Sequence, residues 1–187
     1  MKKLDTRGWK DFVIGDLFRP LKLKRKKGFS KTSDVSTERT AEFDLPLVNA
    51  KHGNNGIMFY GRSSDFESTE MTLDIVQNGA IATGDVYAQI QRTGVLWDAY
   101  LIKPNAAVSE LSLLFLACSV GRAIKQRFSY DDKAVWDKVK MLSVPLPATA
   151  NGNPDFACME AFMRERQGKV RAAVDALQAV AYEGITK

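Results

Sequence analysis

Polar side chains that can hydrogen-bond to nucleic-acid bases gather in three short segments of this 187-residue chain. Asparagine and glutamine amides match the edge of adenine in the major groove, and lysine or arginine matches guanine. These residue types are also common in ordinary turns, so their clustering in one strand-rich region, rather than any single position, favours a nucleic-acid contact. The candidates are Asn49, Lys51, His52, Asn54 and Asn55, then Gln77 and Asn78, then Tyr87, Gln89, Gln91 and Arg92.

A run of cations without an acid lies between residues 19 and 31. The whole chain carries a formal net charge of +5, and a local excess of this kind attracts polyanions. The alternative is a solvated, flexible loop. We expect these side chains to contact phosphates, which set the register of a protein on DNA without reading its sequence. The predicted phosphate contacts are Lys22, Lys24, Arg25, Lys26, Lys27 and Lys31.

Residues typical of enzyme chemistry are scarce. His52 is the single histidine, which excludes His-rich metal sites and any histidine-based triad that does not use it. The sequence has no P-loop and no Gly-x-Ser-x-Gly motif, and the segment 79–84 lacks the glycine spacing of a dinucleotide fingerprint. Cys118 and Cys158 fall in predicted helices away from any CxxC pair, as expected of free thiols in a reducing compartment. We therefore predict no catalytic residue, no metal site and no cofactor in this chain.

The last thirty-odd residues predict one long helix. Asn153 is a favourable N-cap, Pro154 fits the first helical position, Asp155 places a carboxylate in the first turn, and Gly184 offers a stop. Such a helix spans about 45 Å, more than the roughly 35–40 Å diameter of a compact domain of this size. It must therefore wrap the body or pair with another helix. The apolar positions of its coiled-coil-like seam, interrupted at Arg166, form the predicted dimer interface: Phe156, Met159, Met163, Val170, Ala173, Leu177 and Val180.

Segments with strand character dominate residues 43–102, which predicts a twisted, mainly antiparallel sheet. Asn78-Gly79 between the runs 73–76 and 80–84 predicts a hairpin. Ser109 is expected to cap a buried helix that runs to about Phe128, followed by a short helix at 133–140 and a proline-terminated strand at 142–147. The predicted fold class is α+β, with a globular domain over residues 1–150 and a long helix within 151–187.

Hydropathy bears on location. No run of eighteen apolar residues is present, so no membrane span is predicted. The charged start, Met1-Lys2-Lys3, is not followed by an apolar stretch, so no signal peptide is expected. We therefore expect a cytoplasmic protein.

The order of these segments resembles the target recognition domain of the DNA specificity (S) subunits of type I restriction-modification systems and related restriction enzymes. The resemblance rests on Trp9-Lys10 with the segment 14–18 (Ile-Gly-Asp-Leu-Phe), the Asn- and Gly-rich sheet, the helix at 113–128 and the strand 144–147 before a long helix. It covers nearly the whole chain. Members of this family carry two recognition domains and two long helices that pair as an antiparallel coiled coil, so this chain corresponds to about half of one.

The resemblance implies a non-catalytic subunit that binds double-stranded DNA and supplies specificity to methyltransferase and restriction subunits. S-adenosylmethionine, ATP and Mg²⁺ would be bound by those partners and not by this chain. Two explanations for the single domain remain open: a half-subunit that forms a homodimer and reads a split, inverted-repeat site, or a piece of a longer protein. Two other functions also remain open, a protein-interaction module that docks a partner through its C-terminal helix, and a small enzyme that uses His52.

Overall fold

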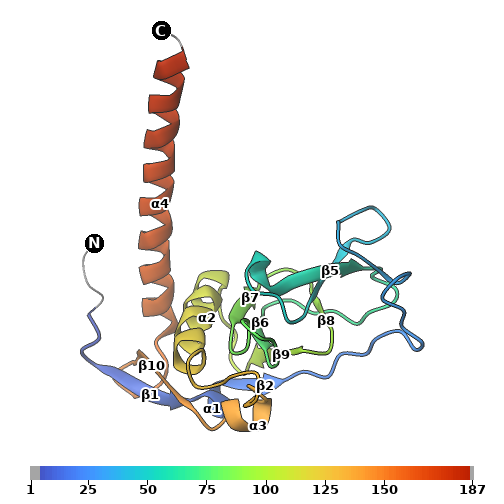
Figure 1. Cartoon of the computed structure of the whole chain (residues 1–187). Helices are drawn as coiled ribbons and strands as arrows, with labels where there is room; N and C mark the ends of the chain where they lie inside the picture. Colours follow the sequence, from blue (N-terminus) through green and yellow to red (C-terminus); the bar gives the residue numbers. More distant parts are fainter. Residues whose placement is uncertain (1–4, 186–187) are drawn as a thin grey trace.

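The computed structural model describes the backbone of residues 5–185 and the side chains of residues 5–179. One long helix, α4 (Phe156–Ile185), projects from a mixed body of short strands and helices (Figure 1). The predicted α+β class is confirmed. Among the described residues, no helix is long and apolar enough to cross a membrane. The elements of the body are β1 (Trp9–Val13), α1 (Ile14–Leu17), β2 (Phe18–Pro20), β3 (Val35–Ser36), β4 (Leu45–Val48), the 3₁₀ turn η1 (Asn54–Gly56), β5 (Ile57–Gly61), β6 (Thr72–Val76), β7 (Val86–Gln89), β8 (Gly94–Val95), β9 (Ala99–Pro104), α2 (Glu110–Ile124), α3 (Trp136–Val139) and β10 (Ser143–Pro147).

The main sheet has the order β2-β9-β6-β7, and all its neighbours are antiparallel. Leu73 and Ile75 of β6 pack with α2 residues such as Leu116 in the largest core. Every residue of β6 is buried, so its opposite face is covered as well. Because side chains alternate along a strand, Asp74 faces away from α2.

The second sheet has the order β3-β5-β4-β8, with a parallel pair between β4 and β8. It lies at the end of the body remote from α4 (Figure 1). Leu47 and Phe59 form a core of their own with Phe66. Val48 packs instead with Leu101 of β9, so a third cluster joins the two sheets. The predicted antiparallel character therefore holds for most, but not all, of the strand pairs.

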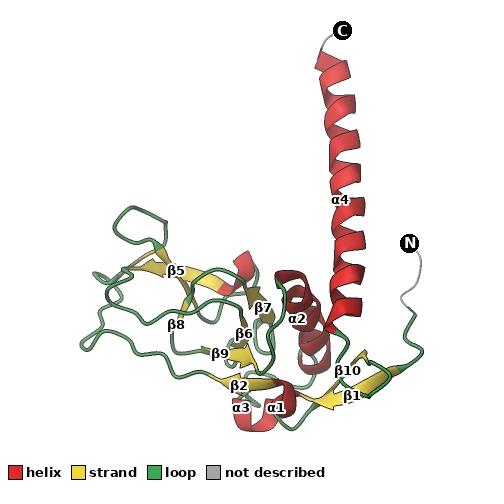
Figure 2. Ribbon diagram, turned by 180° about the vertical axis from the view of Figure 1, so that it is seen from behind, coloured by secondary structure: helices red, strands yellow, loops and turns green. Residues whose placement is uncertain are grey.

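A two-stranded ribbon is formed by the first and the last strand of the body in sequence. β1 pairs antiparallel with β10, from Trp9 opposite Pro147 to Val13 opposite Ser143. This ribbon lies beside the base of α4 when the molecule is seen from behind (Figure 2). The predicted strand at 142–147 is therefore confirmed, and it fixes where α4 leaves the body.

The predicted hairpin around Asn78-Gly79 is wrong. β6 pairs with β7, and residues 77–85 form the loop between them. Thr83 Oγ1 bonds both the N–H and the carbonyl of Gly79, at 2.9 and 2.6 Å, which satisfies polar groups that a strand would have offered to a neighbour. Ile81 is exposed at the tip of this loop.

Both long helices differ from prediction, α2 at its C-terminal end and α4 at both ends. Ser109 caps α2 as expected, but α2 ends at Ile124 rather than near Phe128. α4 starts later than predicted because Asp155, not Asn153, is its cap: Asp155 Oδ1 accepts from the Cys158 N–H at 2.9 Å. The carbonyl of Asn153 instead closes a turn onto Thr149 N–H. α4 also continues through Gly184.

Candidate nucleic-acid interface

The turn between β4 and β5 has an unusual backbone. Four consecutive residues have left-handed φ angles: Gly53 at 75°, Asn54 at 47°, Asn55 at 51° and Gly56 at 75°. Glycine adopts such angles freely and asparagine tolerates them better than most residues, so the sequence Gly-Asn-Asn-Gly explains the shape. Asn54 Nδ2 closes the turn on the Ile57 carbonyl at 2.9 Å. Backbone of this kind concentrates at functional sites.

Side chains of β7 hold the turn from beneath. The Tyr87 hydroxyl accepts from Gly53 N–H at 2.8 Å. Gln89 Nε2 donates to the Asn55 carbonyl at 2.7 Å, and Asn55 Nδ2 donates to Gln89 Oε1 at 3.2 Å. Gln89 is 0% exposed, so the prediction that it contacts DNA is wrong: burial places it against the turn instead.

Asp85 lies under the same turn and accepts three hydrogen bonds. His52 Nδ1 is 2.7 Å and the Tyr87 hydroxyl 3.1 Å from Oδ2, and Lys125 Nζ is 2.5 Å from Oδ1. Burial on its own raises the pKa of Asp85, but the hydrogen bonds from Lys125 and His52 outweigh it, so the pKa lies below its ordinary value. The carboxyl is therefore ionised, and the single histidine is tied to the fold through one ring nitrogen.

A second acid lies deeper in this region. Asp74 of β6 is 0% exposed, and neither of its carboxyl oxygens has a hydrogen-bond partner among the described residues. Burial, and then the charge of Asp85, raises the pKa of Asp74 well above its ordinary value. A Cβ added to Gly56 would lie 2.3 Å from Asp74 Oδ2, so the turn packs directly on this acid. Sequence reasoning selected neither Asp74 nor Asp85, because isolated acids in strand-like segments carry no pattern.

Three predicted base-contacting amides brace loops instead. The buried Asn49 accepts the Asp98 N–H on Oδ1 at 2.8 Å. Gln77 Nε2 donates to the Trp97 carbonyl at 2.8 Å, and Asn78 Nδ2 donates to Asp98 Oδ1 at 3.2 Å. Asn49 is therefore withdrawn as a base contact because it is buried, whereas Gln77 and Asn78 keep part of their surface in solvent.

The run of cations between residues 19 and 31, here called the basic segment, is attached to the body at several points. Lys26 Nζ lies 2.8 Å from Asp34 Oδ1, and Lys24 N donates to Glu67 Oε2 at 2.8 Å. The Arg25 guanidinium lies 5.6 Å from the Trp97 ring centroid, and Lys31 Nζ lies 5.1 Å from that of Phe59. The hydrogen bond from Lys26 holds the pKa of Asp34 below its ordinary value. The other two predicted phosphate contacts, Lys22 and Lys27, are exposed.

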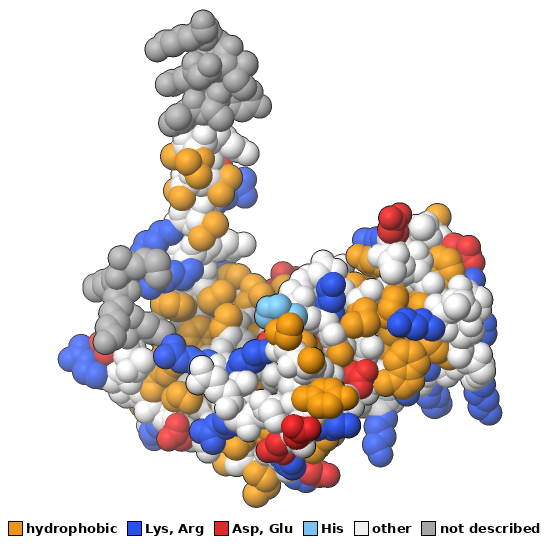
Figure 3. Space-filling view, in the orientation of Figure 1, with side chains coloured by type: hydrophobic (Ala, Val, Ile, Leu, Met, Phe, Trp, Pro, Cys, Tyr) orange, Lys and Arg blue, Asp and Glu red, His pale blue; other side chains and the backbone are white. Residues whose placement is uncertain are grey.

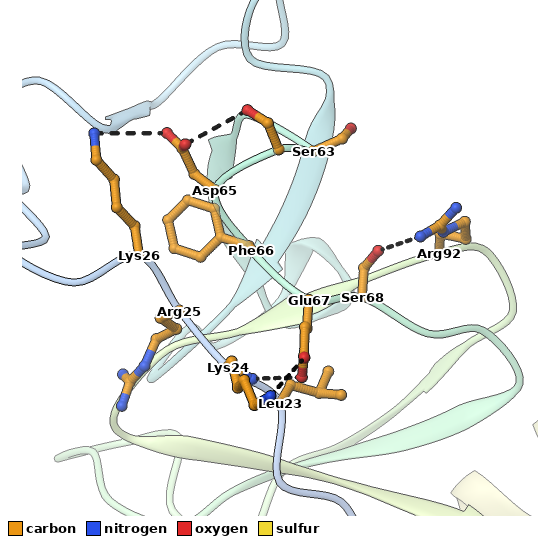
Figure 4. A pocket seen from close by; sticks show the side chains of 11 residues that line it. Leu23, Lys24, Arg25, Lys26, Ser63, Asp65, Phe66, Glu67, Ser68 and Arg92 are labelled. Atoms are coloured by element: carbon orange, nitrogen blue, oxygen red, sulfur yellow. Dashed lines mark hydrogen bonds and ion pairs between the residues drawn. The ribbon is translucent and has the colours of Figure 1, made fainter.

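Arg92, one of the predicted base contacts, lies close to the basic segment. Arg92, with Lys24, Arg25 and Lys26, lines an open pocket of about 600 Å³ (Figure 4). Arg92 Nη2 is held at 3.0 Å by the Ser68 hydroxyl (Figure 4). Four cations from two distant parts of the sequence thus surround one hollow, which also contains the carboxylates of residues 65 and 67.

The predicted contacts therefore fall into two groups. Lys51, His52, Asn54 and Asn55 lie on the strained turn, with Tyr87 beneath them. The second group comprises the basic segment and Arg92, with Gln91 exposed next to Arg92. Figure 3 shows basic side chains (blue) spread over the end of the body remote from α4 and around the base of that helix. Trp97, which was not among the predicted contacts, is 45% exposed next to Arg25.

The predicted helix seam divides into two parts. Met159 is 0% exposed and packs in the core of its own domain, so it is unavailable to a partner helix and that prediction is wrong. Phe156 and Met163 are half-buried against the same core. Phe162 completes this contact, with its ring 5.8 Å from that of Phe115 in α2.

The outer part of α4 presents the other half of the seam to solvent. Val170, Ala173 and Leu177 are exposed, Leu177 by 71%, and so is Val174, which was not among the predicted residues. The side chain of Val180 lies outside the described residues. Figure 3 shows apolar side chains (orange) on the part of α4 that stands clear of the body.

Comparison with known proteins gives a match in structure only. No protein-family model matches the sequence, and no curated protein matches it significantly. The S subunit of a type I restriction-modification system from M. genitalium is similar with a TM-score of 0.55 and 17% identity, over 80% of this chain and 37% of that one. The HsdS subunit from Thermoanaerobacter tengcongensis matches with a TM-score of 0.52 and 14% identity, over 94% of this chain and 41% of that one.

A third solved chain comes from work on complex assembly and conformational transition of the type I R-M system. It matches with a TM-score of 0.55 and 15% identity, over 96% of this chain and 43% of its own length. The chain described here thus spans about two-fifths of each of these proteins. Its body and projecting helix have the fold of an S-subunit recognition domain, which confirms the resemblance at the level of the fold.

Proposed function

We propose that this chain is a non-catalytic, sequence-specific DNA-recognition subunit of a restriction-modification system. The observation that carries the proposal is the fold shared with S subunits over 80–96% of the chain. Residues 1–150 would be the target recognition domain, and residues 151–187 the helix that spaces or pairs two such domains. The DNA-facing residues would be those of the strained turn and of the basic segment.

The arrangement of charge supports a DNA partner. Arg25 of the basic segment lies over the ring of the exposed Trp97, and Arg92 lines the same pocket as Arg25. Lysine and arginine neutralise phosphates, and each contact releases condensed counterions, so binding would weaken steeply with salt. The carboxylates in this region have cationic or hydroxyl partners, which lowers the repulsion that they would exert on a phosphate backbone.

The catalytic partners would be methyltransferase and restriction subunits in a cytoplasmic complex. S-adenosylmethionine, ATP and Mg²⁺ would belong to those partners. Within residues 5–179 no cluster of three metal-ligating side chains occurs, and the role proposed here needs none.

We further propose that the chain forms a homodimer through the outer part of α4. Val170, Val174 and Leu177 are exposed on a helix that stands clear of its own body, and a second copy could bury them. A twofold pair would place two identical recognition faces apart and would read a split, inverted-repeat site.

Two rival functions give different outcomes in solution. A protein-interaction module would bind its partner through α4 and would show no salt-dependent binding to DNA. An enzyme would use His52, whose bond to Asp85 has the geometry of a base with its orienting acid. However, no hydroxyl or thiol within the described residues is hydrogen-bonded to the other ring nitrogen of His52.

Fluorescence anisotropy with a duplex of random sequence, titrated at several salt concentrations, tests the proposal. Charge reversal at Lys24, Arg25 and Lys27 should abolish binding at physiological salt. At lower salt, where binding can still be measured, it should reduce the slope of log K against log salt by about 0.9 per lost contact. The control variant reverses Lys10, Arg122 and Lys138, which changes the net charge equally at other sites. Equal loss of binding by both variants, or no binding by the unmodified chain, would refute the proposal.

Light scattering tests the homodimer. The truncation should be made after Gln167, because removal of all of α4 would strip Met159 from the core and could unfold the body. A dimer that becomes a folded monomer on truncation supports pairing through the outer half of α4. A monomer before and after truncation removes the symmetric-site proposal and leaves DNA binding to be judged on its own.

A further inference from the structure

His52, at the start of the strained turn, is a largely exposed residue that the fold holds through one of its two ring nitrogens. Its Nδ1 is bonded to Asp85, whereas no described residue is hydrogen-bonded to Nε2, and the side chain is 65% exposed. By contrast, the Asn54 and Asn55 amide groups donate to carbonyl oxygens of the fold. His52 therefore keeps a ring nitrogen available to a ligand, whereas the NH2 groups of both asparagines are engaged within the fold.

We infer that Asp85 is a positioning residue for DNA recognition: it orients His52 so that Nε2 contacts a base edge, which makes the His52–Gly56 turn a determinant of specificity. This inference rests on the proposed function, because it names the element of the DNA-binding face that reads sequence. It assigns the basic segment to the phosphates and the turn to the bases.

The chemistry of the His52–Asp85 pair predicts which bases fit. An ionised carboxylate only accepts hydrogen bonds, so the proton between the two groups belongs to Nδ1. A neutral ring then presents Nε2 as an acceptor. In the major groove, the hydrogen-bond donors on base edges are the exocyclic amino groups of adenine and cytosine. The neutral form of His52 should therefore favour adenine or cytosine at the position that it contacts.

The surroundings of Asp85 support a fixed rather than an adaptable contact. Lys125, Tyr87 and His52 all donate to Asp85, and Asp74 faces the same region from β6. Lys125 is itself held from a second side, because its Nζ donates to the Ile81 carbonyl at 2.8 Å. Tyr87 links the cluster to the turn through Gly53 N–H. The ring of His52 is thus oriented by Asp85 together with Lys125, which directly follows α2, and Tyr87 of β7.

Nuclear magnetic resonance of the unliganded chain gives a readout that is independent of DNA. Because the sequence has one histidine, the imidazole nitrogen signals belong to His52 without further assignment. In alkaline buffer the unmodified chain should show the Nδ1–H tautomer. Asp85→Asn should change that tautomer, whereas Asp44→Asn, which removes the same charge at a distant exposed acid, should not. An Nε2–H tautomer in the unmodified chain would overturn the inference.

The second readout is sequence preference, measured by sequencing the bound fraction of a duplex pool with a randomised centre. His52→Ala should reduce the preference for adenine or cytosine at one position of each half-site by about fivefold, the usual worth of one hydrogen bond. Asp85→Asn should affect the same position, and the double variant should lose no more than the more affected single variant, because the two residues act as one unit. His52 is largely exposed, so His52→Ala remains informative even if Asp85→Asn does not fold.

The outcomes separate the inference from the function on which it rests. If the unmodified chain binds duplexes with a steep salt dependence and His52→Ala leaves every preference unchanged, the inference is wrong and the function stands. If the two single variants alter different positions, Asp85 does not act through His52, and the inference is again wrong. If the unmodified chain binds no duplex, both fail.

Discussion

Asp74→Asn tests whether the acid beneath the strained turn is neutral in the native state. Asp74 is fully buried without a hydrogen-bond partner among the described residues, and its pKa is raised well above 3.8 by burial and by the nearby charge of Asp85. The unfolded chain has no such burial. Over the window between 3.8 and the native pKa, unfolding therefore releases a proton, and the free energy of unfolding falls as the pH rises.

The size of the effect follows from linkage. Within that window, the free energy of unfolding of the unmodified chain should lose about 1.4 kcal/mol per pH unit through this group, or about 2.7 kcal/mol over two units. Asparagine has the shape of the neutral acid and does not titrate. The stability of Asp74→Asn relative to the unmodified chain should therefore rise with pH by that amount. Below about pH 4 the pH-dependent difference should disappear.

Urea denaturation followed by tryptophan fluorescence, at several pH values between about 4 and 7, measures the difference directly. The control is Asp44→Asn, because the pKa of Asp44 is lowered by the Ser63 hydroxyl and its pH dependence has the opposite sign. Parallel curves for Asp74→Asn and the unmodified chain would show that Asp74 is ionised in the native state, and the reasoning from burial would be refuted.

Three further perturbations follow from the packing. Gly56→Ala combines a φ of +75° with a Cβ that would lie 2.3 Å from Asp74 Oδ2, so it should destabilise the fold strongly. Gly28→Ala has a φ of +69° and a Cβ that meets nothing within 4 Å, so it should cost about 1–2 kcal/mol for the backbone alone. Thermal unfolding of both variants should show the larger loss for Gly56→Ala. Met159→Ala should cost about 2–5 kcal/mol because it empties a core position, whereas Leu177→Ala should change the stability of a monomer by less than about 0.5 kcal/mol; equal losses measured by urea denaturation would contradict the packing of α4 described above. The pKa of Asp34 is lowered, so its stabilising contribution is present above pH 3.8 and is lost as the pH falls through its native pKa. Asp34→Asn should therefore reduce the loss of stability on acidification, measured from urea midpoints at about pH 3 and pH 6. An unchanged acid dependence would argue against the hydrogen bonds of Asp34 to Lys26 and Ser30.

Local sequence signals located most of the fold. The Ser109 cap, the proline-rich strand before α4 and the apolar spacing of the long helix all correspond to elements of the structure. The failures arose where a side chain competed for backbone groups. Thr83 bonds to Gly79 and turns a predicted strand into a loop. Asp155 caps α4 two residues after the expected cap, since Asn153 is engaged with Thr149.

The candidate site was predictable in composition but not in role. The sequence identified the Asn- and Gly-rich turn and the basic segment, yet it could not distinguish an amide that faces solvent from one that braces a loop. Asn49 and Gln89 have the residue types of base readers, but tertiary packing buries both. The surroundings of Asp74 and Asp85 form only when β6, β7 and the turn pack together, and no local sequence pattern predicts that packing.

The β1–β10 ribbon also sets the order in which the molecule can form during synthesis. Val13 pairs with Ser143, 130 positions later, so the first strand has no partner until almost the whole body has been translated. At about 5–20 residues per second, that wait lasts roughly 7–26 s. During this interval β1, whose Trp9 and Phe12 pack against the main core in the folded chain, lacks the strand with which it pairs. The sheets, whose strands lie closer in sequence, can fold first, and the ribbon can then close. Met159 of α4 enters the core last, before the exposed outer part of that helix has been made.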